Sequence, residues 1–167
     1  HPKFAVAGDP CAAASGRWGY EYDGANRLAA VVDPLLHRTV YEYDRNGNRT
    51  FQHDANTHTT GFAFDELDRL TTKTYPGGAT ESYGYDENGN RTGLTDPKGQ
   101  SFVFGYDALD RLTSETFPNP ASPTGDELET RTTVYDRNGN VTRQEETYSA
   151  SGLAVETQTW DDFDRLL

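Results

Sequence analysis

The chain has 167 residues, with 15 Lys and Arg against 27 Asp and Glu, so its formal net charge is −12. This acidity argues against binding to nucleic acid or to anionic membrane surfaces, both of which need clustered basic residues. The hydrophobic fraction is 34%, aromatic residues make up 12% and there are 16 Gly, which favours an all-β chain with many turns. No stretch is long and apolar enough to span a bilayer as a helix.

Residues 1–16 are rich in Ala, Gly and Pro and contain no repeat, so we expect an irregular lead-in or cap there. The first residue is His1 and the last residues stop inside a repeated motif, so we expect a processed product or a fragment of a longer array. Cys11 is the only cysteine, which excludes an internal disulfide and leaves the compartment undetermined. It has no obvious base nearby, so we do not expect it to act as a nucleophile.

An aromatic residue followed by Asp recurs seven times within residues 17–167, which we expect to form one β array. The copies are Tyr22-Asp23, Tyr43-Asp44, Phe64-Asp65, Tyr85-Asp86, Tyr106-Asp107, Tyr135-Asp136 and Trp160-Asp161. The first five aspartates are spaced by 21 residues, and the last two steps are 29 and 25 residues. An Arg follows four or five positions after most of the aspartates, as Arg27, Arg49, Arg69, Arg91, Arg111 and Arg165. Such regularity identifies a repeat protein.

Each of the first five copies carries two aromatic residues two positions apart, as in Tyr20/Tyr22 and Tyr41/Tyr43. Residues two apart lie on the same face of a strand, so each pair predicts a strand end with two rings on one face. We expect the rings of adjacent strands to stack, and each cross-strand pair to contribute roughly 0.2–1 kcal/mol.

Two kinds of motif turn alternate, which makes the full period 42 residues. One contains Asn-Gly-Asn, with Gly47, Gly89 or Gly139 at its centre, and we expect a short hairpin there because both Asn and Gly tolerate positive φ. The other contains Leu-Asp-Arg-Leu, at 67–70 and 109–112, with a related copy at 163–166.

A second set of turns separates the motif hairpins, at Asp33-Pro34, Pro76-Gly77-Gly78 and Asp96-Pro97-Lys98-Gly99. The predicted fold is therefore an all-β antiparallel meander of hairpins. Residues 117–129 contain three Pro and account for the 29-residue step, so we expect a loop inserted there.

We expect the Asp and Arg of each motif to be structural: the Asp caps the turn, and the Arg pairs with it or lies over a Tyr ring. The Asn-Gly-Asn turns resemble a calcium loop but lack a closing Glu. His53, Asp54 and His58 are a possible zinc set without a known spacing, and a solvated loop is preferred. We expect no metal, no cofactor and no catalytic residue.

These motifs closely resemble the YD repeat of Rhs (rearrangement-hotspot) proteins, on residues 43–50, 104–113 and the turn at 75–78. The resemblance covers roughly residues 17–167 and implies a curved, spirally wound sheet that forms part of a hollow shell. Members include the C components of insecticidal toxin complexes, which enclose a toxic segment, as well as wall-associated bacterial proteins and teneurins. The toxin members carry an aspartic autoprotease whose signature is not found here, and residues 96–99 resemble part of it only superficially.

The resemblance implies a non-enzymatic scaffold segment of a shell that encloses or presents a toxin or another polypeptide. The alternative is a secreted or cell-surface bacterial protein that self-associates into filaments through open strand edges, or that binds glycans with exposed rings. An enzyme would need activity that depends on an unrepeated residue, and none stands out. The expected partners are other YD repeats, an enclosed polypeptide or glycans.

Overall fold

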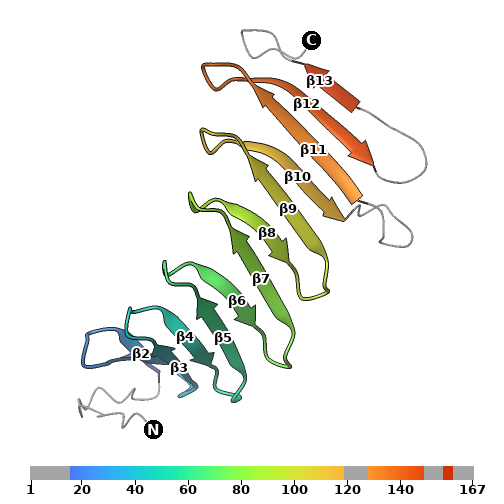
Figure 1. Cartoon of the computed structure of the whole chain (residues 1–167). Coiled ribbons are helices and arrows are strands. Elements are labelled where there is room, and N and C mark those ends of the chain that lie inside the picture. The colour runs from blue at the N-terminus through green and yellow to red at the C-terminus, as the bar shows by residue number, and fades with distance from the viewer. Residues whose placement is uncertain (1–15, 119–127, 149–155, 160–167) are drawn as a thin grey trace. The chain divides into compact units, whose positions relative to one another are not determined.

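The computed structural model describes residues 16–118, 128–148 and 156–159, which form the strands β1–β13 and no helix (Figure 1). Within this described part, nothing resembles a helix able to cross a membrane. The chain divides into two compact units, residues 1–80 and 81–167. The predicted all-β antiparallel meander is confirmed in each unit.

The first unit is a meander in which each strand pairs antiparallel with the next one along the chain. Short turns connect the strands, so neighbours in sequence are also neighbours in the sheet. The strands are β1 (Gly19–Tyr22), β2 (Leu28–Val32), β3 (Arg38–Tyr43), β4 (Arg49–His53), β5 (Thr59–Phe64) and β6 (Leu70–Thr74).

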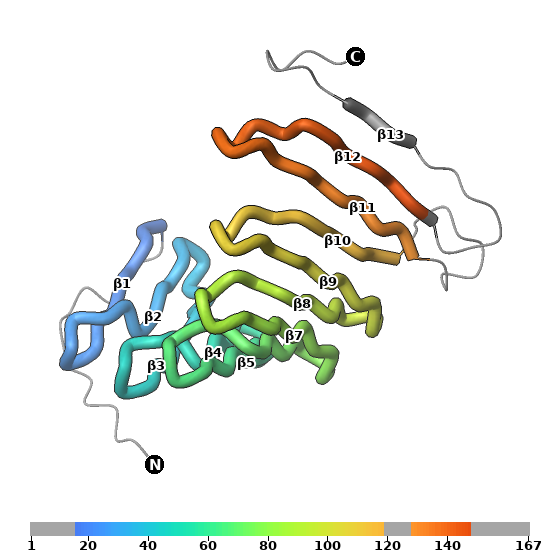
Figure 2. The backbone as a smooth tube through the Cα atoms, turned by 45° about the horizontal axis from the view of Figure 1, so that its top comes forward, coloured from blue at the N-terminus to red at the C-terminus, as the bar shows by residue number. Residues whose placement is uncertain are grey.

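The second unit follows the same rule, and Figure 2 traces its hairpins as successive strands. Its strands are β7 (Thr80–Tyr85), β8 (Arg91–Thr95), β9 (Ser101–Tyr106), β10 (Leu112–Pro118), β11 (Leu128–Tyr135), β12 (Val141–Tyr148) and β13 (Glu156–Thr159). The loop predicted at 117–129 is too long at both ends, because Phe117 pairs with Glu129 and Pro118 pairs with Leu128. Residues 119–127 lie outside the described part.

Each motif hairpin contains a β-bulge just after its turn, where the pairing register shifts by one residue. In β4, for example, Tyr43 pairs with Arg49 and Glu42 pairs with Phe51, so Thr50 is left unpaired. Such bulges increase the local twist of a strand pair. The bulged residues are Ala29, Thr50, Thr71, Thr92, Thr113 and Thr142.

The described residues contain almost no interior. Ala30 is the only buried hydrophobic residue among them, and no large side chain is fully buried. Most strand residues are half-buried. Cohesion must therefore come from contacts that run along each sheet, between one hairpin and the next, and these contacts are concentrated at the motif turns.

Candidate functional site

All of the described short turns share one pattern of backbone hydrogen bonds, at both ends of the strands. In the first, Asn26 N–H donates to the carbonyl of Asp23 at 2.9 Å, and Asp23 N–H donates to the carbonyl of Arg27 at 2.8 Å. This is a three-residue hairpin loop, a type I-like turn closed by a residue in the left-handed region. This left-handed residue stands three residues after the first residue of the turn. In the described turns it is Asn26, Leu36, Gly47, Thr57, Asp68, Gly78, Gly89, Gly99, Asp110 or Gly139.

The hairpins predicted for the Asn-Gly turns are confirmed. Of Asn46 and Gly47, only Gly47 has positive φ, at 100°. A three-residue loop needs a single left-handed residue, and Gly47 supplies it. The prediction for Pro76-Gly77 is confirmed, since Gly77 has φ 92° and Gly78 donates to the carbonyl of Tyr75.

The motif aspartate caps its own turn. Asp44 Oδ1 accepts the backbone N–H groups of Asn46, Gly47 and Asn48 at 2.9, 2.9 and 2.8 Å. Because these bonds favour the ionised form, the pKa of a capping carboxyl falls below its usual value. For Asp65, the backbone N–H of Arg69 is the main cause of the lowered pKa, and it outweighs the opposing effect of partial burial.

The second carboxylate oxygen of the cap binds the side chain four residues later. Arg27, Arg69 and Arg111 donate Nε to their aspartates at 2.7 Å each. Asn48, Asn90 and Asn140 donate Nδ2 at 3.1, 3.0 and 3.0 Å in the Asn-Gly-Asn turns. His37 and His58 occupy the same position in second turns, 2.8 and 3.0 Å from Asp33 and Asp54. One turn design thus accepts three side-chain types.

Arg49 and Arg91 do not pair with their aspartates but lie over aromatic rings, which was the other arrangement predicted for the motif Arg. Each is the first residue of a strand and stands five residues after its aspartate, because an Asn stands four residues after it. The Cζ of Arg49 lies 5.4 Å from the ring centroid of Tyr41 and 4.9 Å from that of Phe62. The Cζ of Arg91 lies 5.2 Å from the ring centroid of Phe104. These arginines make cation–π contacts instead of ion pairs.

The same contacts correct the prediction of stacked rings. Tyr41 is on β3 and Phe62 is on β5, and β4 lies between them. The guanidinium of Arg49 fills the space between the two rings, so aromatic and cationic groups alternate along the face. Within the described part, the ring pair in stacking contact is Phe51 with His53, on a single strand.

A motif whose Arg stands four residues after its Asp connects to the next motif through that Arg and a Tyr. Arg27 Nη1 donates to the carbonyl of Asp44 at 2.8 Å, and its Cζ lies 4.8 Å from the Tyr43 ring centroid. The Tyr43 hydroxyl donates back to the carbonyl of Leu28 at 2.8 Å. The second unit repeats all three contacts, with Arg111 to Asp136 at 3.0 Å, Arg111 over Tyr135 at 4.6 Å, and Tyr135 to Leu112 at 2.9 Å.

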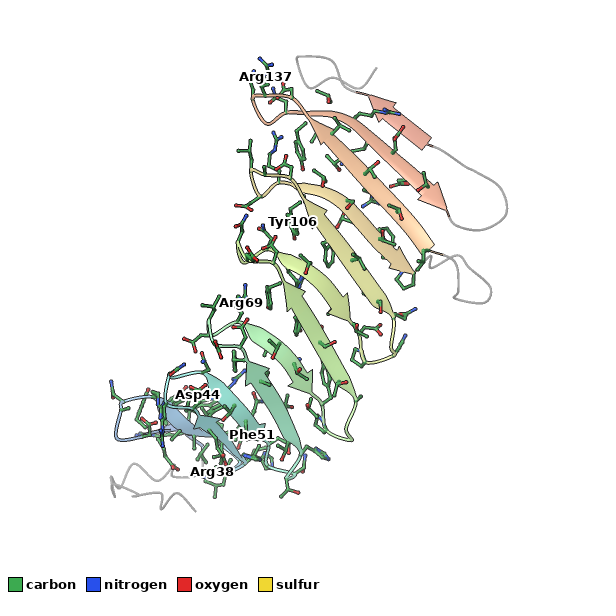
Figure 3. The ribbon with its side chains drawn as sticks, in the orientation of Figure 1. Arg38, Asp44, Phe51, Arg69, Tyr106 and Arg137 are labelled. Carbon is green, nitrogen blue, oxygen red and sulfur yellow. The ribbon has the colours of Figure 1, made fainter. Side chains whose placement is uncertain are left out.

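A motif with Asn-Gly-Asn connects to the next one through amides. Asn46 and Asn48 both donate Nδ2 to Asp68 Oδ1, at 2.8 and 2.5 Å. Asn88 and Asn90 make the same pair of bonds to Asp110, at 2.8 and 2.7 Å. Asp68 and Asp110 are the left-handed residues of the following turns. Figure 3 shows Asp44 and Arg69 at the motif-turn ends of their hairpins in the first unit.

Two features escaped the sequence analysis. Thr71 and Thr113 sit at the bulges and donate Oγ1 to the carbonyls of Ala63 and Gly105, at 3.2 and 3.1 Å. The recurrence of Thr directly after the motif was the available signal.

The second feature is Arg131, which binds Glu146 at 2.7 Å and lies within 4 Å of Glu115 and Glu129.

The predicted metal alternatives find no support in the geometry. His53 bonds to Glu42 and Thr59, whereas His58 bonds to Asp54, so the three candidate zinc ligands do not converge. In the calcium alternative, the Asn46 and Asn48 side chains turn amide N–H groups toward a carboxylate, which leaves no ring of oxygen ligands. Among the described residues, no three His, Cys, Asp or Glu side chains form a candidate metal group.

The structure brings most of the predicted motif residues to the motif-turn ends of their strands. Phe64, Tyr85, Asp86 and Tyr106 close β5, β7 and β9 or begin the turns that follow, and the Tyr106 hydroxyl donates to the carbonyl of Arg91 at 3.0 Å. Trp160, Asp161, Arg165 and Cys11 lie outside the described residues, as does nearly all of the predicted lead-in.

Comparisons with known proteins identify the repeat. The sequence model of the RHS Repeat family matches residues 22–52, 43–80, 64–101 and 85–121, which together span more than half of the chain. No curated protein sequence matches the chain significantly.

Solved structures share the fold. A chain of the crystal structure of TcdB2-TccC3-Cdc42 matches with a TM-score of 0.65 and 21% identity, over 90% of this chain and 9% of that one. A chain of TcdB2-TccC3 without the hypervariable C-terminal region matches with a TM-score of 0.66 and the same identity and coverage. A chain of the Tc holotoxin pore of Photorhabdus luminescens, with a mutated TccC3, matches with a TM-score of 0.63 and 22% identity, over 85% of this chain and 8% of that one. The present chain therefore spans less than a tenth of the length of these chains.

Proposed function

Because this chain belongs to the RHS repeat family, we propose that it is a wall segment of a shell that encloses or presents another polypeptide, such as a toxin. The observation that supports this function is the direction of its cohesive contacts. The side-chain bonds of the motif turns run within a hairpin or to the next hairpin, while the described residues form almost no apolar interior. Such a sheet extends by adding hairpins, which suits a wall.

The similar structures support the same proposal, since their chains belong to TcdB2-TccC3 toxin complexes. In this proposal the segment has a structural role and supplies no catalytic residue. A bacterial protein that is secreted or carried on the cell surface is the expected context. The enclosed polypeptide would contact one face of the strands, and the other face would meet solvent.

Cysteine labelling in the full-length protein that carries this segment tests the proposal. Thr133 and Val134 are adjacent on β11, so their side chains point to opposite faces. Each is replaced singly by Cys in a Cys11→Ser background and exposed to a bulky maleimide. A shell protects one of the two positions in the native protein, whereas both react in the isolated segment and after denaturation. Equal reactivity of the two positions in the native full-length protein would contradict the proposal.

A second candidate function, association of copies through a strand edge, is favoured by β1. Among the described strands β1 pairs with β2 alone. Trp18, just before β1, is 59% exposed, and Tyr20 and Tyr22 on β1 are 56% and 58% exposed. Tyr43 donates its hydroxyl to the preceding hairpin, but Tyr22 has no such acceptor in the described part. Another repeat hairpin would supply one. If so, Trp18→Ser with Tyr22→Ser lowers the weight-average mass in sedimentation, while Leu67→Ser, at an exposed turn tip, does not.

A further inference from the structure

Asn46-Gly47 and Asn88-Gly89 place an asparagine before a glycine in an exposed turn. We propose that these asparagines are deamidation sites, and that the carboxylates of Asp68 and Asp110 lower the rate of the reaction. This inference is independent of the proposed shell, because it concerns only the chemistry of two turns and their neighbours.

The reaction needs no enzyme. The backbone nitrogen of Gly47 attacks Cγ of Asn46, a new N–C bond forms, and the Cγ–Nδ2 bond breaks. The former amide proton of Gly47 leaves with Nδ2 as ammonia. Water then opens the cyclic imide to an aspartyl or isoaspartyl residue, so atoms balance without any oxidant. Glycine favours the attack because it has no Cβ to obstruct the approach.

The structure restrains both reacting groups. Asn46 Nδ2 donates to Asp68 Oδ1 at 2.8 Å, so the side-chain amide must break this bond before its Cγ can reach the attacking nitrogen. Gly47 N–H is held by Asp44 Oδ1 at 2.9 Å. The charge of Asp68 also disfavours the negative charge that develops on Oδ1 of Asn46 during the attack. Asn88 is held in the same way by Asp110, at 2.8 Å.

Deamidation would break the link between neighbouring turns. It replaces an amide donor with a carboxylate next to Asp68, and like charges at that distance repel. The isoaspartyl product also adds a methylene to the backbone of a turn whose hydrogen bonds fix its length. The contacts of Arg27 with Asp44 and Tyr43 involve other atoms, so only every second link in the array is sensitive.

The test is peptide mapping by mass spectrometry of the whole chain during incubation at mildly alkaline pH. The variant Asp68→Gly removes the carboxylate at a position with φ 59°, which glycine adopts without strain. Conversion of Asn46 is expected to accelerate roughly tenfold, the factor expected for loss of one hydrogen bond to a charged group. Asn88 in the same molecules keeps its rate. Asp110→Gly gives the mirror result.

Two controls make the comparison specific. Asp68→Asn keeps an acceptor oxygen and is expected to give an intermediate rate at Asn46. Tyr43→Phe removes a different bond between hairpins of the same unit and is expected to leave the Asn46 rate unchanged. Uniform acceleration at all Asn-Gly sites, no acceleration, or an equal effect of Tyr43→Phe would overturn the proposal.

Discussion

The side-chain amide of Asn48 donates to Asp68 Oδ1 at 2.5 Å and so joins two turns that lie 20 residues apart in the chain. Asp68 can receive this bond because it occupies the left-handed position of its own turn. The preceding motif uses a different link, from the guanidinium of Arg27 to the carbonyl of Asp44. Two link chemistries that alternate explain why the repeat has a period of two motifs.

The hydroxyl of Tyr43 is expected to stabilise its unit through the carbonyl of Leu28. Tyr43→Phe keeps the ring and removes the bond, so the free energy of unfolding should fall by about 0.5–1.5 kcal/mol. Urea denaturation measures the change. Tyr20→Phe is the matched control, because Tyr20 is 56% exposed and its hydroxyl has no partner in the described part. An equal loss in both variants would refute the assignment.

The planar guanidinium of Arg111 makes contacts that an ammonium cannot reproduce. It binds Asp107, donates to the carbonyl of Asp136 and lies over Tyr135. Arg111→Lys keeps the charge but loses the fork, and should destabilise by roughly 1–2 kcal/mol. Arg137→Lys, at an exposed turn tip, should leave the thermal midpoint unchanged. If Arg111→Lys left the stability unchanged, charge alone would matter at this position.

The left-handed position of each turn makes opposite predictions for different residues. Thr57 has φ 67°, an unfavourable conformation for a β-branched residue, so Thr57→Gly should stabilise by about 0.5–1 kcal/mol. Gly47 has φ 100°, and Gly47→Ala should destabilise by roughly 1–2 kcal/mol. Gly24→Ala is the control, because Gly24 lies outside the left-handed region and faces open space. Differential scanning calorimetry compares the three variants.

Acid should weaken the turns. Hydrogen bonds from Arg69 and Arg111 lower the pKa of Asp65 and Asp107 below the usual value of 3.8. The unfolded chain then binds more protons than the folded chain between the two values, so the stabilisation is fully present above the usual pKa and is lost as pH falls through the lowered one. The urea concentration at the midpoint of unfolding should therefore decrease as the pH is lowered below about 4.

The net charge of −12 complicates that pH profile, because acid also relieves repulsion among carboxylates. Added salt screens the repulsion and isolates the effect of the turns. Asp65→Asn should reduce the pH dependence in the same range. A profile that is identical in the variant and the parent would contradict the role given to this carboxylate.

Much of the fold could be predicted because the strands and turns of the repeat depend on residues that are close together in the chain. The aromatic pairs predicted strand ends, and Pro76-Gly77 predicted a turn that the structure confirms. The Asn-Gly hairpins were predicted and are present, but Gly47 alone takes positive φ, because the loop has three residues and only one of them is left-handed. The prediction left the motif Arg two arrangements, pairing with the Asp or lying over a Tyr ring. Arg27 makes both contacts, whereas Arg49 lies over a ring and Asn48 binds Asp44 in its place.

The sequence by itself determined the strands, the turn positions and the two-motif period, since each depends on residues close together in the chain. Only the tertiary structure decided which groups connect one hairpin to the next. Arg49 lies between the rings of Tyr41 and Phe62, and Asp68 receives the amides of the preceding turn, because strand register sets which side chains meet. Register is a property of paired strands, and single-chain spacing does not contain it.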